Sequence, residues 1–395
     1  MSSLALLRTN QPFQRLWAAR TISYFGDSLS LVTLMLYVAQ STGQASAVAM
    51  LLLVGDFAPA LVSPLTGTVS DRFDLKRVMV GCELAQAGLV AVIALWLPAL
   101  PLLLLLVGLR SVVAQIFQPA SRAAVPQLVR ADDLPAANAA VGFGTNVGET
   151  VGPLAAAVAI PLLGIRGALL VDVATFLVSA TVLGVMPQIQ RGERAVLTSF
   201  LGDARAGLAY MWRSRIVRTI TLGYFGVVAF NGIDDVALVF LATDALDGGE
   251  SAVGLLLAAV GLGLIVGYAL LGRGKTRMSM VALLLTGLAT VSAGNLLTGL
   301  AWAVIAAFTL QALRGIGIAA LEVAANTMLQ QTVPAEVLGR VFGTLYGAIG
   351  LAAGFSYVAG GVLLDLTGPR VTLVVAGTGG LLVTLATALA LRRRR

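Results

Sequence analysis

Hydrophobic residues run along most of this chain in long, nearly continuous stretches that short polar segments separate. A membrane-spanning helix needs about 20 apolar residues, whereas a strand of a spanning barrel needs about ten residues of alternating polarity. The stretches have the helical length, and twelve of them are present. We therefore predict spans over 17–40, 46–68, 77–98, 100–121, 138–162, 166–187, 217–243, 252–271, 279–300, 302–323, 341–363 and 370–391.

The composition agrees with a protein that lies in a bilayer. Of the 395 residues, 58% are hydrophobic and 11% are charged, whereas about 25% of the residues of a soluble domain are charged. A soluble enzyme is excluded, because a soluble fold needs far more charge to cover its surface. The predicted fold class is an all-α membrane protein.

The polar stretch 188–216 divides the spans into six and six. We predict an N-terminal six-helix bundle over 1–187, a cytoplasmic linker over 188–216 and a C-terminal six-helix bundle over 217–395. Four apolar residues in the linker favour a short amphipathic helix on the membrane surface: Phe200, Leu201, Leu208 and Met211.

The two predicted halves share an internal repeat. Leu109 and Arg110 match Leu313 and Arg314 at an offset of 204 residues. Two parallel six-helix repeats are typical of one large class of transporters, in which the substrate cavity lies between the halves near the middle of the membrane.

Positive charge is distributed unevenly about the spans. With the N-terminus inside, the outer loops hold only Arg166 and Arg370 among the basic residues. The cytoplasmic segments hold many more, among them Arg8, Arg15, Arg20, Arg122, Arg130, Arg213, Arg215, Arg218 and Arg340. Because basic residues favour the cytoplasmic side, we predict a multi-pass protein of a bacterial inner membrane with both termini in the cytoplasm. The net charge of +7 then requires no nucleic-acid partner.

The chain contains no histidine and a single cysteine, Cys82. Histidine metal sites and imidazole proton relays are excluded, so carboxylates must carry any protons that cross. The sequence shows neither a nucleophile–base cluster nor a G-x-x-x-x-G-K-[ST] phosphate loop. We expect a protein that is not an enzyme, binds no metal or cofactor, and uses a proton gradient rather than ATP.

The loop after the second predicted span carries a motif of five residues: Gly67, Asp71, Arg72, Lys76 and Arg77. The motif resembles the signature G-x-L-a-D-R-x-G-r-k-r of the major facilitator superfamily (MFS), with Asp74 in place of the second glycine. The resemblance implies two pseudo-symmetric six-helix bundles and a gating role, in which Asp71 faces the positive end of a helix in the other half. Plain positive-inside charge is the alternative, and it explains neither Gly67 nor Asp71.

Predicted span five contains small residues at helical spacing, followed by a proline: Gly144, Gly148, Gly152 and Pro153. Glycines four residues apart give a smooth face for close helix packing, and Pro153 can bend the helix. The run resembles the MFS antiporter motif G-x-x-x-G-P-x-x-G-G, with Ala156 and Ala157 in place of the last two glycines. The resemblance implies export, and tight packing alone is the alternative.

The segment from Phe13 to Asp27 carries a third motif. Its residues LWAARTISYFG resemble the opening L-[FW]-x-x-R-x-I-S-x-x-G of the drug-efflux, macrolide-efflux and enterobactin-exporter branch of the MFS. With the other two motifs, the resemblance covers the whole chain, but none of the motifs specifies a substrate.

Several ionisable residues are predicted to lie deep within the spans, where a charge costs about 3 kcal/mol unless it faces a cavity or a partner. An arginine beside a buried carboxylate keeps it ionised, whereas a low-dielectric cavity favours its protonation. Alternation between these two settings would couple proton flow to conformation. We expect a cavity lined by Asp27, Tyr37, Asp56, Arg110, Glu149, Asn231, Asp234, Arg314 and Glu322.

Among these residues, Asp27 paired with Arg110 is the first candidate for the coupling site, and Glu149 and Asp234 come second. A purely structural salt bridge is the alternative reading of Arg110. Two further acids near the ends of their spans are expected only to hold helices together: Glu83 and Asp172.

The sequence thus predicts a secondary active transporter that works by alternating access between two bundles. Few polar groups in spans one, four and seven favour a proton-coupled exporter, an antiporter of amphipathic small molecules or drugs. We expect a monomer whose partners are this substrate, protons and the lipid bilayer. A proton-coupled nutrient importer and a lipid-moving membrane protein are the alternatives.

Overall fold

The computed structural model describes residues 1–42, 47–48, 50–55, 62, 66, 68–69, 73–188, 200–246, 249–274 and 278–392, and they form helices and short connections. The first half contains α1 (Ser3–Thr9), α2 (Gln11–Thr42), α4 (Leu75–Trp96), α5 (Leu100–Leu128), η1 (Ala131–Asp133) and α6 (Leu134–Gly184). The rest contains α7 (Phe200–Arg213), α8 (Arg215–Asn231), α9 (Asp234–Phe240), η2 (Leu241–Ala245), α10 (Gly249–Leu271), α11 (Met280–Gly299), α12 (Val304–Thr332) and α13 (Ala335–Arg392).

Nine helices among the described residues are long and apolar enough to cross a membrane. Two of them, α6 with 51 residues and α13 with 58 residues, are far too long for one crossing of a hydrocarbon core about 30 Å thick. Each contains a glycine with positive φ, Gly164 at 71° and Gly368 at 79°, a backbone conformation that favours glycine. These glycines divide α6 and α13 into two crossings each, at the two places where the sequence predicts a turn.

Predicted span 46–68 falls mostly outside the described residues. The eleven other predicted spans each have a helical counterpart, and α5 and α12 continue several residues beyond the predicted ends. The described residues therefore have the predicted all-α architecture in two halves. The exact limits of 1–187, 188–216 and 217–395 stay a prediction.

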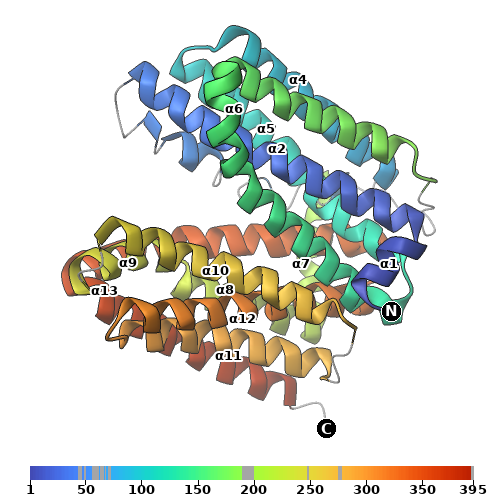
Figure 1. Cartoon of the computed structure of the whole chain (residues 1–395). Coiled ribbons are helices and arrows are strands. Elements are labelled where there is room, and N and C mark those ends of the chain that lie inside the picture. Colours follow the sequence, from blue (N-terminus) through green and yellow to red (C-terminus); the bar gives the residue numbers. More distant parts are fainter. Residues whose placement is uncertain are drawn as a thin grey trace.

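The two halves form separate bundles that meet at one end of the molecule (Figure 1). One bundle holds α2, α4, α5 and α6, and the other holds α8 to α13. The first helix of α6 slants across to the other bundle, where it contacts α10 and α12. Both ends of the described chain lie at the end where the bundles meet.

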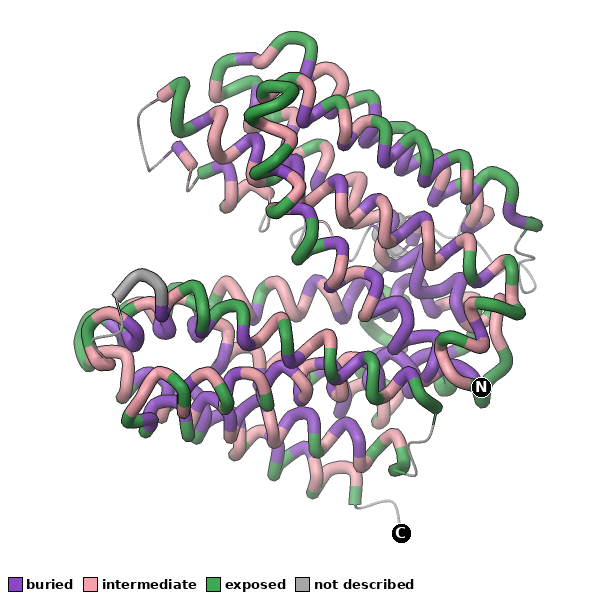
Figure 2. The backbone as a smooth tube through the Cα atoms, viewed as in Figure 1, coloured by how far each residue is buried: buried purple, intermediate pink, exposed green. Residues whose placement is uncertain are grey.

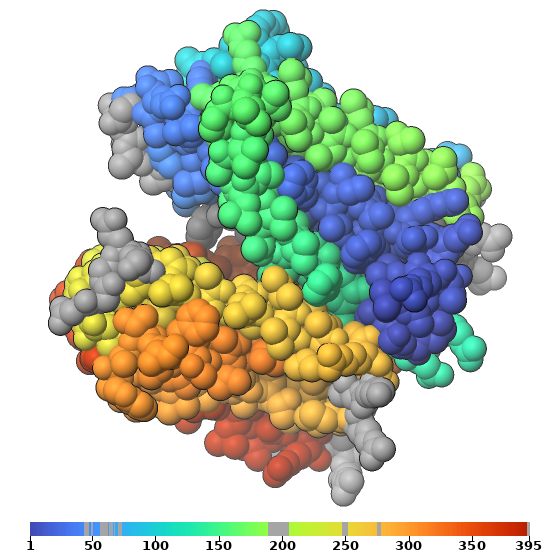
Figure 3. Space-filling view, in the orientation of Figure 1, coloured from blue at the N-terminus to red at the C-terminus, as the bar shows by residue number. Residues whose placement is uncertain are grey.

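The apolar core is shared between the halves at that end only. One cluster there joins Phe117 and Val141 of the first half with Leu321 and Phe342 of the second. At the opposite end each bundle has a cluster of its own. Buried residues gather where the bundles meet (Figure 2), and the surface is hollowed between them at the opposite end (Figure 3). The molecule is thus closed at the end of the N-terminus and open at the other.

Polar contacts add to the closure. Asn138 of α6 donates hydrogen bonds from Nδ2 to Thr327 Oγ1 at 3.0 Å and to Gln330 Oε1 at 2.7 Å, both on α12. Gln330 Nε2 in turn donates to the carbonyl of Arg122 on α5 at 3.0 Å. The Arg122 guanidinium lies 6.0 Å from the centre of the Tyr346 ring on α13. These contacts can separate only when the closed end opens.

The predicted small-residue face of α6 is confirmed as a packing surface against α2. A Cβ at Gly148 would lie 2.9 Å from the amide nitrogen of Phe25, and one at Gly152 would lie 2.9 Å from that of Leu29. Only glycine permits this approach of the two backbones. Pro153 lies inside the helix, and the non-helical dihedral angles occur at Gly164 instead.

Predicted span 217–243 has its counterpart in one candidate span, Arg215–Ala245, which a short turn at 232–233 divides. Helix α8 ends at Asn231, α9 starts at Asp234, and η2 continues as a π-helix. Gly232 lies in the break, where a Cβ would be 3.0 Å from Cβ of Ser356 on α13. Three polar residues mark the break in the sequence, because Asn231, Asp234 and Asp235 interrupt the apolar run there.

Three arginines that the charge pattern places in cytoplasmic segments are buried within helices: Arg20, Arg122 and Arg340. Arg20 donates to Ser121 Oγ and, at 3.4 Å, to Gln118 Oε1. Their position relative to the cytoplasmic side of the membrane stays a prediction.

The predicted linker contains the helix α7, with Met211 buried and Leu208 exposed. Gly207 of α7 packs on α13, where its Cβ position is 2.7 Å from Cβ of Arg340. Helix α7 therefore docks on the C-terminal bundle. Its contact with a membrane surface stays a prediction.

Candidate functional site

An ion pair joins two helices in the interior of the first bundle. Arg110 Nη2 on α5 lies 2.9 Å from Asp27 Oδ1 on α2, and the two side chains keep 15% and 25% of their surface exposed. The pairing predicted from sequence is present. Its role in proton coupling stays a prediction.

Arg110 also lies near a second carboxylate. Its Nη1 atom is 3.9 Å from Asp172 Oδ2 on α6, and the Asp172 side chain is fully buried. Thr175 Oγ1 donates to Asp172 Oδ1 at 3.2 Å. Gly26 leaves the space for both side chains, because a Cβ there would overlap Thr175 and Asp172. Arg110 thus stands between two acids on different helices.

A third acid, Glu83 of α4, belongs to the same cluster. It is fully buried and accepts a hydrogen bond from Ser23 Oγ at 3.2 Å. The charges of Asp27 and Asp172 act on the Glu83 carboxylate.

The sequence analysis predicts that Glu83 and Asp172 only hold helices together, because they lie near the ends of their spans. Distance from a span end does not tell which way a side chain faces. A usable signal was the helical spacing of Asp172, Thr175 and Ser179, which places three polar side chains on one face of an otherwise apolar helix.

Two cavities adjoin the ion pair, and Tyr24, Asp27, Arg110 and Ser111 line both of them. The first has a volume of about 210 Å³ and mainly apolar walls. Its other lining residues are Ser28, Leu31, Leu34, Leu51, Gly55, Val107 and Glu149. Of the predicted cavity residues, the structure therefore brings together Asp27, Arg110 and Glu149.

The second cavity has a volume of about 270 Å³ and is more polar. Its lining includes glutamines that sequence reasoning did not select for the cavity: Gln86, Gln115 and Gln118. A glutamine is uncharged, so it does not stand out in an apolar span of the sequence. Only the packing of α4 and α5 shows that these three side chains line the cavity at Asp27. Together the two cavities give the ion pair one apolar side and one polar side.

The second bundle contains the repeat-related ion pair. Arg314 of α12 contacts Asp234 of α9 directly, and the side chains are only 8% and 5% exposed. Arg314 Nη1 also donates to Gln311 Oε1 at 3.2 Å. Asn295 links Gln311 to Asn231, through bonds of 3.2 Å and 2.9 Å. Amides therefore enclose this pair, whereas a cavity adjoins the pair in the first bundle.

Two other predicted cavity residues lie elsewhere. Tyr37 Oη donates to the carbonyls of Leu97 at 2.5 Å and Pro98 at 3.1 Å, which holds the end of α2 against α4. Tyr37 therefore does not join the cavity at Asp27. Glu322 Oε2 accepts a hydrogen bond of 2.6 Å from Tyr268 Oη within the second bundle.

Part of the predicted site falls outside the described residues, namely Asp56 and the motif residues Gly67, Asp71 and Arg72. Of the remaining motif residues, Lys76 Nζ donates to the carbonyl of Met186 at 2.5 Å. The backbone amide of Arg77 donates to Asp74 Oδ1 at 2.9 Å. Asp74, which replaces the usual glycine, thus caps the start of α4.

Comparison with known proteins gives consistent relatives. The family described as transmembrane secretion effector matches residues 1–394. The uncharacterised MFS-type transporter YfiS of Bacillus subtilis (strain 168) is 26% identical, over 97% of this chain and 94% of its own. Macrolide efflux protein A of Streptococcus pyogenes is 21% identical, over 93% of this chain and 92% of its own.

The fold also has solved counterparts. A bacterial homologue of the iron transporter ferroportin, crystallised in an outward-facing state, has a TM-score of 0.81 at 15% identity. The match covers 96% of this chain and 99% of that one. Identity this low establishes similarity of fold and nothing about the substrate.

Proposed function

Because the chain belongs to the transmembrane secretion effector family of MFS transporters, which are not enzymes, we propose that it exports amphipathic small molecules in exchange for protons. The observation that carries the proposal is the Arg110–Asp27 ion pair between an apolar and a polar cavity. The similarity to a protein named for macrolide efflux supports the direction of transport.

The charge balance of the cluster supports a proton-binding role. Three acids, Asp27, Glu83 and Asp172, share the interior with Arg110, which contacts two of them, and with Arg20, whose charge acts on Glu83 without an ion pair. One carboxylate would be left without a positive partner if all three were ionised. An uncompensated charge in a low-dielectric interior is costly, and binding a proton removes that cost. The cluster therefore holds a proton that can be passed on.

The geometry also offers a step that links the proton to movement. Protonation of Asp27 removes the charge that holds Arg110, and Asp172 is then the carboxylate that remains within reach at 3.9 Å. Arg110 lies on α5, Asp27 on α2 and Asp172 on α6. A change of partner thus alters the attraction between the helices that line the cavity.

The larger movement in this proposal is alternating access, in which the two bundles move relative to one another. The bundles are joined at the end of the N-terminus through the shared core and the Asn138–Gln330 hydrogen bond. With that end in the cytoplasm, as the charge pattern predicts, the structure corresponds to the outward-open state. Breaking the contacts at the closed end and closing the open end would produce the inward-open state.

The cavity walls favour an amphipathic substrate. Leu31, Leu34 and Val107 offer an apolar surface, while the carboxylate of Glu149 and the ion pair stand at its border. A sugar or another fully polar nutrient would leave these apolar walls without a matching group. A molecule with an apolar body and one polar or cationic group satisfies both parts.

Transport in proteoliposomes tests the proposal. Vesicles with the purified chain and an imposed pH gradient should move a macrolide or a lipophilic dye against its gradient, and an uncoupler should abolish this movement. Asp27→Asn should reduce gradient-driven transport to the level of protein-free vesicles, because the site can no longer exchange a proton. Substrate binding to the variant should persist.

Asp365→Asn is the matched control, because Asp365 is exposed on α13 and the charge change is the same. It should transport like the natural chain. Transport that survives the uncoupler, or an Asp27→Asn variant that is fully driven by the gradient, would refute proton exchange at this site.

A further inference from the structure

Helix α1 lies at the closed end of the molecule, where the two bundles meet (Figure 1). It leads into α2 of the first bundle, and it packs mainly on α2 and α6. Its residue Leu6 is buried and belongs to the core that the bundles share. The first residue of α1, Ser3, also contacts the second bundle. This short helix therefore touches both halves of the protein.

Two hydrogen bonds of Ser3 join the bundles. Its backbone amide donates to the carbonyl of Gly272 at 2.5 Å, and Gly272 directly follows α10 of the second bundle. Its Oγ atom donates to the carbonyl of Ala136 on α6, in the first bundle, at 2.6 Å. When the bundles separate at this end, Ser3 cannot keep both partners.

The bond to Gly272 pairs two backbone groups that have no partner within their own helices. Ser3 is the first residue of α1, so its amide has no acceptor inside that helix. The Gly272 carbonyl follows the end of α10, where carbonyls likewise have no amide to accept from. The positive end of α1 thus faces the negative end of α10. When the closed end opens, water reaches both groups, so the bond can break and form again.

The fit at Gly272 is close. A Cβ there would lie 2.6 Å from Ser3 Oγ and 3.1 Å from Ser3 Cβ, so a larger residue would push α1 away. Beside this contact lies a cavity of about 490 Å³ that residues of α1, α2, α6 and α10 line. Because α1 leaves this space unfilled, it does not pack tightly on α10, and the Ser3–Gly272 bond is a polar link that holds it there.

The other end of α1 is tied to the first bundle. Asn10 Nδ2 donates to the carbonyl of Leu128, the last residue of α5, at 2.6 Å. Asn10 Oδ1 accepts a hydrogen bond of 3.0 Å from the backbone amide of Phe13, which is fully buried. Helix α1 therefore moves with the first bundle, and separation of the bundles at this end pulls Ser3 away from Gly272.

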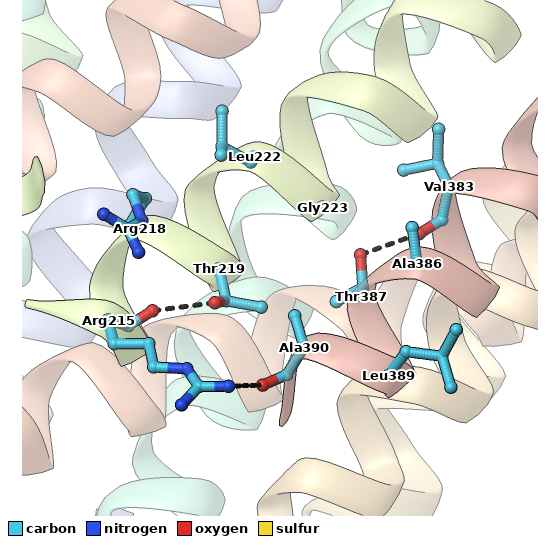
Figure 4. Close-up of a pocket in the computed structure, with 10 residues that line it drawn as sticks. All are labelled: Arg215, Arg218, Thr219, Leu222, Gly223, Val383, Ala386, Thr387, Leu389 and Ala390. Atoms are coloured by element: carbon cyan, nitrogen blue, oxygen red, sulfur yellow. Dashed lines mark hydrogen bonds between the residues drawn. The ribbon is translucent and has the colours of Figure 1, made fainter. Parts of the chain in front are cut away.

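Hydrogen bonds within one bundle do not break in such a movement. Figure 4 shows an example at the same end of the molecule, where Arg215 Nη2 of α8 donates to the carbonyl of Ala390 on α13 at 2.8 Å. Both helices belong to the second bundle and move together. The Ser3–Gly272 bond is of the other kind, because its partners belong to different bundles.

We propose that α1 is a clasp on the closed end: the Ser3–Gly272 bond stabilises the state with this end closed, and it breaks each time the end opens. The proposal rests on the alternating access proposed above. A hydrogen bond of ordinary strength changes the ratio of two states about fivefold. Loss of the clasp should therefore favour the open form of this end without preventing the movement.

Ser3→Pro removes the amide donor and is compatible with α1. Proline is tolerated at the first position of a helix. It favours an extended residue before it, and Ser2 is extended, with φ −78° and ψ 156°. Ser3→Ala is the matched control, because it also loses the hydroxyl group but keeps the amide that donates to Gly272.

Spin labels across the closed end measure the effect of these variants. In a Cys82→Ala background, labels at Arg130→Cys and Met278→Cys report the share of molecules in which this end is open. The ratio of open to closed molecules should be about fivefold higher with Ser3→Pro than with Ser3→Ala. Ser3→Ala should give the same ratio as the natural residue.

A disulfide across the clasp gives the opposite test. In the same background, Ser3→Cys/Gly272→Cys brings together two Cβ positions 3.1 Å apart, close to the separation of about 3.5–4.5 Å in disulfides. Oxidation of the double variant in proteoliposomes should abolish transport, and a reductant should restore it. The single variants Ser3→Cys and Gly272→Cys should not respond to oxidation.

The outcomes separate the clasp from the proposed function. Equal ratios in Ser3→Pro and Ser3→Ala, full transport by the oxidised double variant, or free thiols that persist after its oxidation would overturn the clasp and leave alternating access intact. If the distance between the labels stays short at every pH in the chain with the natural Ser3, this end never opens, and the proposed function fails together with the clasp.

Discussion

At the scale of single residues, the two halves place the same ion pair in different surroundings. Arg110 and Arg314 occupy repeat-related positions, and each pairs with an aspartate. The pair with Asp27 borders two cavities, whereas amides and apolar side chains enclose the pair with Asp234. A pair that water or substrate reaches can exchange protons more readily than an enclosed pair.

The enclosed pair should therefore matter for stability. Asp234→Asn leaves the Arg314 charge buried without a carboxylate, and breaking a buried pair in this way costs about 3–5 kcal/mol. Thermal unfolding in detergent should show a clearly lower midpoint for this variant. Asp27→Asn should lower the midpoint less, because its pair is partly exposed. If the unfolding midpoint falls equally in the two variants, enclosure of an ion pair does not change its contribution to stability.

Sequence reasoning identified both arginines and two of the three carboxylates near them, Asp27 and Asp234, because charge in an apolar run is conspicuous. It misjudged Asp172 and Glu83, whose importance depends on the face they present to Arg110 and Ser23. It also placed Tyr37 in the cavity. The sequence of α2 does not show that the end of this helix, where Tyr37 lies, packs on the end of α4.

At the scale of elements, the contact between α2 and the first helix of α6 is the tightest part of the first bundle. Gly148 and Gly152 bring the α6 backbone against the backbone of α2. Asp27 lies on α2 next to this contact, and Asp172 lies on the second helix of α6. The glycines thus set the separation between α2 and the first helix of α6.

Gly148→Ala should disturb that contact. The new Cβ would lie 2.9 Å from the Phe25 amide nitrogen and 3.0 Å from the Thr21 carbonyl oxygen, and a backbone cannot rotate away as a side chain can. We expect a loss of about 1–3 kcal/mol in the free energy of unfolding, typical of overpacking. Circular dichroism during thermal unfolding measures it.

Gly88→Ala supplies the comparison, because nothing lies within 4 Å of its Cβ position on α4. It should leave stability unchanged or raise it slightly, since alanine favours helix over glycine. If Gly148→Ala proves as stable as Gly88→Ala, the glycine face does not set the packing of α2 and α6.

Element prediction from hydropathy succeeded wherever a polar turn ends an apolar run. It foresaw the turns at Gly164 and Gly368, because Arg166 and Arg370 follow them closely. It did not foresee the break at Gly232, although Asn231, Asp234 and Asp235 interrupt the apolar run there. In the structure, Gly232 packs closely on Ser356 of α13.

At the scale of the whole molecule, two bundles share a core at one end and separate at the other. The contacts at the closed end are mostly apolar, with the Asn138–Gln330 bond among the polar ones. Such an arrangement can exchange one closed end for the other without unfolding either bundle. The central claim is that protonation at Asp27 drives this exchange.

Spin-label distances across both ends test that claim most directly. In a Cys82→Ala background, Trp96→Cys with Trp302→Cys would report on the open end, and Arg130→Cys with Met278→Cys on the closed end, since all four positions are exposed. On acidification in nanodiscs, the first distance should shorten and the second should lengthen. With Asp27→Asn added, both distances should become independent of pH. Distances that do not respond to pH in the natural sequence, or that respond equally with Asp27→Asn, would contradict the account.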